Sequence, residues 1–208
     1  MKTFSKYVPH MLLGAYIIEF LVLAINPTDR SVWLTENLTV MPIAIVLAVL
    51  YMRGVRFSNL SYVLMSILLY MHTYGGHYTF ALAPFDWFNN MFGFERNMYD
   101  RVAHMTVGFY AYPIIEMSLK YRIVTKKWFA YLAAFAVIPA IAALYEIFEW
   151  RYAVSADPTA GIAVLGSQGD IWDAQKDMLM DSLGGVIAVV LYMMFPSDKN
   201  KDASASNA

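Results

Sequence analysis

Four aspartates precede the last apolar stretch of the chain at helical spacing. They lie in the segment GDIWDAQKDMLMDSLGG, at Asp170, Asp173, Asp177 and Asp181. At about 100° per residue, a helix would carry all four carboxylates within an arc of roughly 80°. For Asp170 and Asp173, a structural role at the helix start is an equally good interpretation. Asp181 lies two turns further on. A carboxylate there costs about 2.5–3.5 kcal/mol in a membrane, so we expect it to face the bundle interior and to have a partner.

Three other segments, HTYGGHY, DRVAH and YEIFEW, place ionisable side chains at the ends of apolar stretches. These side chains belong to His72, His77, Asp100, His104, Glu146 and Glu149. The Asp–His pair is spaced i,i+4 and the Glu–Glu pair i,i+3, so each pair shares a helical face. The two histidines of HTYGGHY do not share a face. Gly75 and Gly76 lie between them and predict a break in the helix that turns both rings inward.

Crowded carboxylates in a medium of low dielectric repel one another unless a positive group lies among them. Protons, Arg101, a cationic substrate or a divalent metal ion would each supply that charge. Oxygen ligands with one or two imidazoles suit Mg²⁺, Mn²⁺, Ca²⁺ or Zn²⁺. The candidate metal ligands are His72, His77, Asp100, His104, Glu146, Glu149, Asp173 and Asp177. None of these spacings is a diagnostic metal motif, so the prediction requires that the segments meet at one end of the bundle.

Each candidate also has a structural interpretation. His104 alone would more often be a hydrogen-bonded core histidine. For Glu146 and Glu149 the less favoured alternative is that they are interfacial carboxylates that face water, with Arg151 as a surface partner. Two further acidic residues, Glu19 and Glu116, fall within apolar stretches. They are either partners for Arg or Tyr side chains inside the bundle or members of a second polar layer.

The composition of the chain is that of an integral membrane protein. Of its 208 residues, 59% are hydrophobic and 15% are charged, whereas soluble domains have about 45–50% and about 25%. The apolar residues fall into blocks of about 18–22, the length that crosses a bilayer core. They predict an all-α polytopic bundle of six transmembrane helices, at 8–25, 38–53, 57–74, 99–119, 128–150 and 174–195.

The chain is expected to form a single transmembrane domain, 1–196, followed by a disordered cytoplasmic tail, 197–208. Segments between the spans are interpreted as loops, among them NPTDRSVWLTEN and RYAVSADPTAGIAVLGSQGD. The first apolar stretch is interpreted as a retained span, because it carries Glu19 and no convincing cleavage site. There is no cysteine, so disulfides and thiolate chemistry are excluded.

Lysine and arginine indicate the orientation. Six spans place both termini on one side, together with the second and fourth loops. That side is richer in basic residues, among them Lys2, Arg53, Arg56, Lys120 and Lys127. The positive-inside rule therefore predicts cytoplasmic N- and C-termini, with the acidic and histidine-containing segments at the extracytoplasmic side.

The run HTYGGHYTF, followed by YDRVAH, YEIFEW and GDIWDAQKDMLMDSLGG, closely resembles the YjdF-type family of bacterial inner-membrane proteins, a domain family of unknown function. This resemblance covers essentially the whole chain apart from the tail and implies a multi-pass protein of the inner (cytoplasmic) membrane. More distantly, D-x-x-x-H, Y-E and D…D…G resemble the VanZ-like family, which is linked to glycopeptide-antibiotic resistance. The matching positions are Asp100, His104, Glu146, Asp173, Asp181 and Gly184 or Gly185. HTYGGHY, Glu149 and Asp177 depart from the VanZ-like pattern, so resistance is not carried over.

These features favour an intramembrane site, open to the extracytoplasmic side, that binds a divalent metal. It would act on a lipid or envelope precursor by hydrolysis or phosphoryl transfer. In this hypothesis Glu146 is the general base and His104 is a ligand or proton shuttle. The alternative is a proton- or cation-coupled transporter or membrane sensor that uses the carboxylate row as a relay. A transporter would need polar positions that continue to the inner leaflet, with Glu19 and Glu116 in register with Asp181.

A third, structural interpretation is that the polar cluster only holds the helices together. The basic residues occur singly or in short clusters beside the spans, as topology requires, so nothing indicates a nucleic-acid partner. The partners that the sequence predicts are the lipid bilayer and a lipid-like substrate. The sequence leaves the oligomeric state open.

Overall fold

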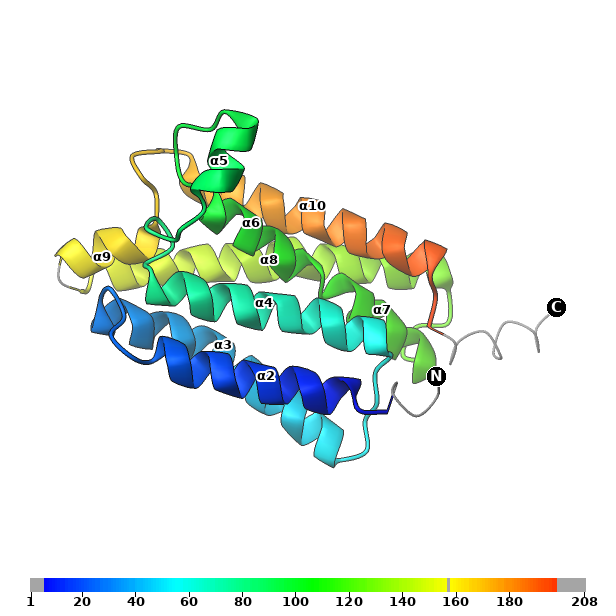
Figure 1. The fold of residues 1–208 in the computed structure, drawn as a ribbon. Coiled ribbons are helices and arrows are strands. Elements are labelled where there is room, and N and C mark those ends of the chain that lie inside the picture. The colour runs from blue at the N-terminus through cyan, green and yellow to red at the C-terminus, as the bar shows by residue number, and fades with distance from the viewer. Residues whose placement is uncertain (1–5, 157, 198–208) are drawn as a thin grey trace.

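The computed structural model describes residues 6–156 and 158–197, and in these ranges the chain is helical with no strand. The helices are α2 (Val8–Leu23), α3 (Arg30–Met52), α4 (Asn59–His77), α5 (Asp86–Phe92), α6 (Tyr99–Gly108), α7 (Ala111–Lys120), α8 (Lys127–Ala153), α9 (Pro158–Leu165) and α10 (Asp173–Met194). The long helices run along one shared direction, and α6 and α7 follow each other along it (Figure 1). The short helices α5 and α9 lie at one end of this bundle (Figure 1).

The long helices of the chain have the length and the apolar composition of membrane-spanning helices. Among the described residues, α3, α8 and α10 are long and apolar enough to cross a membrane, and α2 is a shorter apolar helix. Large apolar side chains such as Ile18, Leu21 and Leu144 lie on outward faces and are more than 60% exposed. A continuous apolar exterior of this kind requires lipid rather than water around it. The prediction of an all-α membrane protein is confirmed.

Helix α3 begins eight residues before the predicted span, so the prediction of a loop for NPTDRSVWLTEN is wrong over residues 30–37. Asp29 is the cause, because its carboxylate accepts hydrogen bonds from the backbone N–H groups of Ser31 at 2.7 Å and Val32 at 3.0 Å. An N-cap of this kind satisfies backbone donors that a helix start would otherwise leave unpaired. The added turns bring Glu36 into the bundle, where it is 2% exposed.

The predicted break at Gly75 and Gly76 is also wrong, because α4 continues through both glycines to His77. A Cβ atom at Gly76 would lie 2.9 Å from the Cβ of Glu36, and one at Gly75 would overlap the ring of Phe80. The glycines are therefore required for close packing against α3 and the following turn, and they do not turn the chain.

The predicted fourth span is interrupted, since α6 ends at Gly108 and α7 begins at Ala111. Pro113 explains the interruption. Proline has no N–H to donate, and its ring clashes with the carbonyl of the residue four positions earlier, which is Phe109. The break separates the polar α6 from α7, which packs in the apolar part of the bundle.

Two short helices lie in segments that were predicted to be loops. Helix α9 occupies part of RYAVSADPTAGIAVLGSQGD and starts at Pro158, a residue suited to a first helical turn. It packs against α8 and α3. Helix α5 lies in the long aromatic connection after α4 and ends at Gly93, whose φ of 71° is in the left-handed region that glycine adopts readily.

Helices α6 and α10 approach each other more closely than side chains would permit. A Cβ atom at Gly184 would overlap the carbonyl oxygen of Met105, and one at Gly108 would overlap the backbone of Asp181, Gly184 and Gly185. Gly184, Gly185 and the buried Ala188 form a strip of small residues on α10 that permits this approach. This contact sets the distance between the DRVAH segment and the aspartate row.

The opposite half of the bundle is apolar and contains the buried Leu64, Ile115, Ile138 and Tyr192. Its one fully buried carboxylate among the described residues, Glu116, has a structural role. Glu116 accepts hydrogen bonds at the start of α4 from the backbone N–H of Ser58 at 2.8 Å and from the hydroxyls of Ser58 at 2.8 Å and Ser61 at 2.5 Å. It thus caps α4 together with Ser58, the N-cap residue.

The division into a domain at 1–196 and a disordered tail at 197–208 stays a prediction. Residues 198–208, which make up nearly all of that tail, lie outside the described residues.

Candidate functional site: a buried aspartate–histidine cluster

Two arginines neutralise the outer part of the aspartate row. The guanidinium of Arg101 lies 2.5 Å from Asp173 Oδ1 and forms a second ion pair with Asp177. Arg96 approaches the same oxygen of Asp173 at 2.8 Å. Arg101 is only 3% exposed, so its charge is held among the carboxylates inside the protein. Asp173, a predicted metal ligand, is therefore a partner of two arginines.

Asp170, the outermost member of the row, has a local structural role. Its carboxylate accepts a hydrogen bond from Lys176 Nζ at 2.6 Å and one from the backbone N–H of Trp172 at 3.1 Å. These interactions, led by the one with Lys176, lower the pKa of Asp170. The bond to the N–H two residues ahead forms an Asx turn, which leads the chain into α10. The structural interpretation of this residue is therefore supported.

The inner part of the row surrounds His104. His104 Nε2 lies 3.7 Å from Asp100 Oδ1 and 3.9 Å from Asp177 Oδ1. These three ligand atoms all lie within 4.8 Å of one another, and all three residues are buried. Two ligand atoms that share an ion at about 2.0–2.2 Å lie at most about 4.4 Å apart, and both distances from His104 Nε2 meet this limit. DRVAH and the aspartate row therefore meet, as the predicted site requires.

Asp181 determines which nitrogen of His104 faces the cluster. The Nδ1 atom lies 3.3 Å from Asp181 Oδ2. When Nδ1–H donates to this carboxylate, Nε2 carries the free lone pair, and Nε2 is the atom that faces Asp100 and Asp177. A carboxylate behind a histidine in this way is the usual arrangement for a metal-binding imidazole. Asp181 is 1% exposed, and its Oδ1 has no hydrogen-bond partner in the described part of the chain.

A cavity of about 210 Å³ adjoins the cluster. Its polar lining comes from Thr39, His72, Asp100, His104, Tyr145, Glu149 and Asp181. Its apolar lining includes Val40, Ile43, Leu68, Ile141 and Val164. The cavity therefore combines ionisable groups with a hydrocarbon wall, as a site for an amphipathic molecule requires.

The two glutamates of YEIFEW differ in their relation to this cavity. Glu149 lines it, is 8% exposed, and forms neither a hydrogen bond nor an ion pair with the described residues. Glu146 is not a lining residue, although its Oε1 is buried and has no hydrogen-bond partner in the part of the chain that the structure describes. Both carboxylates interact electrostatically with His104 and Asp100. Of the two, Glu149 is the carboxylate available to a molecule in the cavity.

Sequence reasoning missed a second ionisable group, Glu36, which contacts two residues that line the cavity, His72 and Tyr145. Glu36 Oε2 lies 3.0 Å from His72 Nε2 and accepts a hydrogen bond from the hydroxyl of Tyr145 at 3.1 Å. The ring of Tyr145 lies between the two imidazoles, with its centroid 6.1 Å from that of His72 and 6.0 Å from that of His104. Tyr145 therefore connects the Glu36–His72 pair with the aspartate cluster.

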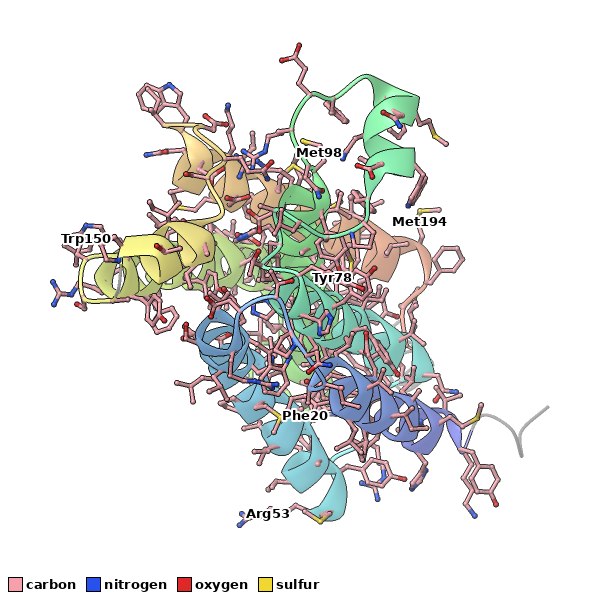
Figure 2. All side chains as sticks on the ribbon, turned by 60° about the vertical axis from the view of Figure 1, so that its left-hand side comes forward. Phe20, Arg53, Tyr78, Met98, Trp150 and Met194 are labelled. Atoms are coloured by element: carbon pink, nitrogen blue, oxygen red, sulfur yellow. The ribbon has the colours of Figure 1, made fainter. Side chains whose placement is uncertain are left out.

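Two loops cover the cluster at the end of the bundle that Figure 2 brings forward, near Met98. The amide of Gln168 and the backbone of Asn97 exchange two hydrogen bonds, both of 3.0 Å, which join the loop before α10 to the loop before α6. Gly166 adopts a φ of 60°, and a Cβ atom there would lie 3.1 Å from Asp100 Oδ2. The loop thus passes directly over this aspartate.

Three of the acidic and histidine residues selected from the sequence lie elsewhere. His77 Nδ1 lies 2.7 Å from the carbonyl oxygen of Leu23, which ties the end of α4 to the end of α2. Glu19 is partly exposed on α2, and its Oε2 has no partner among the described residues. Glu116 caps α4 in the apolar half. None of them lines the cavity.

A curated relative and a family model both match this chain over most of its length. The chain is 32% identical over 178 residues to the inner membrane protein YjdF of Escherichia coli strain K12, with 82% of each chain covered. No solved structure matches the chain. The more distant VanZ-like resemblance stays a prediction.

Residues 8–197 match the model of a family described as "Predicted membrane protein (DUF2238)". This range includes every helix of the bundle and every residue of the aspartate–histidine cluster. The chain belongs to the DUF2238 family of membrane proteins.

Proposed function

We propose that Asp100, His104 and Asp177 bind one divalent metal ion, and that this ion serves hydrolysis or phosphoryl transfer on a lipid or envelope precursor. The observation that carries the proposal is the convergence of three buried ligand atoms within 4.8 Å, with Asp181 behind the imidazole. The two arginines pair with Asp170, Asp173 and Asp177, whereas no described arginine or lysine forms an ion pair with Asp100 or Asp181. A divalent cation would balance the remaining negative charge. One imidazole with oxygen ligands suits Mn²⁺ or Zn²⁺.

The cavity suits a lipid-like substrate because one of its walls is apolar and the other is polar. The apolar wall, with Val40, Leu68 and Ile141, suits a hydrocarbon chain, and the polar wall suits a phosphate or ester group beside the metal. There the ion would polarise a phosphoryl or carbonyl oxygen and lower the pKa of a bound water. The sequence-based choice of general base was Glu146. We assign the role to Glu149 instead, because Glu149 lines the cavity and forms no hydrogen bond or ion pair with the described residues.

A transporter or sensor that relays protons is less well supported. A relay would require ionisable groups that continue from Asp181 toward the other end of the bundle. That half contains the apolar cluster around Ile115 and Ile138, and the carboxylate of Glu116 is occupied by Ser58 and Ser61. The one-sided placement of the polar groups favours an enzyme pocket over a path through the membrane.

The test uses purified protein in detergent or lipid vesicles, loaded with Mn²⁺ or Zn²⁺. We expect about one ion per wild-type chain by elemental analysis, and a large loss of bound metal in Asp177→Asn. Glu149→Gln should retain the ion, while turnover of lipid phosphates or lipid esters falls by about 10²–10⁴-fold, as expected for a lost general base. If wild-type protein contains no stoichiometric metal, the proposed metal site is wrong. If Glu149→Gln retains full turnover, Glu149 is not the general base.

We also propose that the bundle crosses the membrane six times, by α2, α3, α4, the α6–α7 pair, α8 and α10, with cytoplasmic termini. The start of α2 and the end of α10 lie at the same end of the bundle (Figure 1), which an even number of spans requires. The connection between α7 and α8, with Lys126 and Lys127, lies at that end too (Figure 1). Its basic residues favour the cytoplasmic side.

Because the chain has no cysteine, single cysteines report directly on this topology. A membrane-impermeant maleimide applied to intact spheroplasts should label Glu95→Cys but not Lys126→Cys. Both variants should react once the membrane is permeabilised. The reverse labelling pattern would show the opposite orientation, and labelling of both sites in intact cells would contradict an odd number of spans between them.

A further inference from the structure

A second cavity, of about 350 Å³, lies between α2, α3 and α4 in the half of the bundle away from the aspartate cluster. Its lining is almost entirely apolar and includes Leu12, Leu13, Leu47, Ala48 and Leu69. The cavity is formed because α2 and α3 each pack on α4 while the C-terminal end of α3 leads away from the rest of the bundle. Figure 2 shows Arg53 at the projecting tip of α3.

It is unfavourable for such a groove either to hold water or to stay empty. Water requires polar partners, and an apolar lining offers it few. An empty groove of this size forfeits the dispersion contacts that its walls would otherwise make. In a membrane protein the groove faces hydrocarbon, so an acyl chain from the bilayer would fill it.

The end of the groove nearest the start of α2 carries aromatic side chains with polar groups. The imidazole of His10 meets the ring of Tyr51 edge-on, with their centroids 5.1 Å apart, and Tyr62 lies 6.3 Å from Tyr51. All three residues line the groove. Amphipathic rings of this kind are typical of the level where acyl chains meet headgroups. A lipid in the groove would therefore place its headgroup at this end.

Basic side chains gather at this end, and the carboxylate of Glu116 at the start of α4 is hydrogen-bonded to Ser58 and Ser61 and not to a cation. The guanidinium of Arg56 lies over the ring of Tyr51, 3.7 Å from its centroid, and Lys120 Nζ donates a hydrogen bond to the Arg56 backbone carbonyl at 2.7 Å. Neither residue, nor Lys6 or Arg53, forms an ion pair with any described carboxylate. At the opposite end, Arg96, Arg101 and Lys176 are all paired with aspartates. Arg30 and Arg151 at that end likewise form no ion pair with a described residue, so the groove end is distinguished by the grouping of Arg53, Arg56 and Lys120 beside its aromatic rings.

We propose that this groove is a binding site for an anionic phospholipid of the surrounding bilayer. One acyl chain lies along Leu12, Leu47 and Leu69, and the phosphate meets Arg56 beside His10 and Tyr51. The hydrocarbon groove supplies affinity through burial, and the cations supply the preference for a net negative headgroup over a zwitterionic one. This site is separate from the aspartate–histidine cluster and does not depend on metal binding there.

Native mass spectrometry of detergent-purified protein tests the proposal, with phosphatidylglycerol and phosphatidylethanolamine of identical acyl chains added in competition. We expect one tightly held phosphatidylglycerol per chain. Ala48→Trp, which fills the groove, should reduce its binding at least tenfold, and Arg56→Gln should remove the preference for the anionic lipid. Ala136→Trp, on an exposed face of α8, and Arg151→Gln, at the other end, are the matched controls.

Equal retention of the two lipids by wild-type protein would overturn the proposal. So would unchanged binding in Ala48→Trp, or a chain dimer that Ala48→Trp dissociates, since a second copy would then occupy the groove. Arg56 lies outside the packed helices, so its variant decides the headgroup preference even if the tryptophan variant fails to fold.

Discussion

Replacing Gly184 with alanine is expected to lower the apparent melting temperature of the detergent-purified protein by roughly 2–12 °C. Overpacking typically costs about 1–3 kcal/mol, and each kcal/mol shifts Tm by about 2–4 °C at this chain length. The added methyl group would overlap the carbonyl oxygen of Met105, which is backbone and cannot rotate away. Helices α6 and α10 must then separate. Because these helices carry His104 and Asp181, the separation also weakens the cluster, and metal affinity should fall with stability.

Two other glycines provide matched controls. A Cβ atom at Gly185 would meet only side chains, at 3.4 Å or more, and nothing lies within 4 Å of one at Gly14. Gly185→Ala and Gly14→Ala should therefore leave both the melting temperature and the metal affinity close to wild type. If Gly184→Ala behaves like Gly14→Ala, the close contact between α6 and α10 does not hold the site together.

The second large effect is a loss of metal affinity when His104 is replaced. His104→Gln should weaken Mn²⁺ or Zn²⁺ binding by more than about 100-fold, because it removes the only imidazole nitrogen of the ligand set. Asp181→Asn should weaken binding by about 10–100-fold, because Asp181 orients the ring without contacting the ion. Titration against a chelator of known affinity measures both losses.

His77→Gln is the control for this experiment. His77 was an equally good candidate ligand by sequence, but its ring is bonded to the carbonyl of Leu23, so the substitution should leave metal affinity unchanged. A loss of affinity in His77→Gln equal to that in His104→Gln would mean that the ion is bound elsewhere. If Asp181→Asn leaves the metal affinity unchanged, Asp181 does not position the ring of His104.

The aspartate row and DRVAH were predictable because helical spacing alone places their side chains. Asp177 and Asp181 share one face of α10, and Asp100 and His104 share one face of α6. Gly184, which lets these faces approach each other, directly follows the aspartate row in the sequence. What spacing could not show is the pairing of Arg101 with Asp173 and Asp177, since arginine side chains are long and select their partners only in the folded bundle.

Glu36 was missed because its segment is polar and was interpreted as a loop. A signal was nevertheless present. Asp29 stands where an N-cap would, and Val32, Glu36 and Val40 follow at intervals of four, which is the buried face of α3. A polar first turn does not exclude a helix whose inner face meets other polar groups. Tyr145 stands in the Y-E pair of the sequence pattern, but its contact with Glu36 could not be predicted while the segment of Glu36 was interpreted as a loop.

Some local sequence signals determine the backbone by themselves, and others depend on the tertiary contacts of the residue. The interruption of the fourth span is an example of the first kind, and the glycine pair in HTYGGHY is an example of the second. Gly75 and Gly76 permit either a turn or a close helix contact, and only the position of Glu36 and Phe80 decides between them. Pro113, in contrast, acts through its own covalent structure, so the break before α7 could have been predicted from the sequence.

Pulsed EPR of Mn²⁺ bound to protein with ¹⁵N-labelled histidine tests the central claim most directly. The chain has four histidines, and the structure places one of them, His104, in the ligand set. We predict hyperfine coupling from a single imidazole nitrogen bound to the ion, lost in His104→Gln and retained in His77→Gln. Bound Mn²⁺ with no coupled nitrogen, or a coupling that survives in His104→Gln, would contradict a metal centre at Asp100, His104 and Asp177.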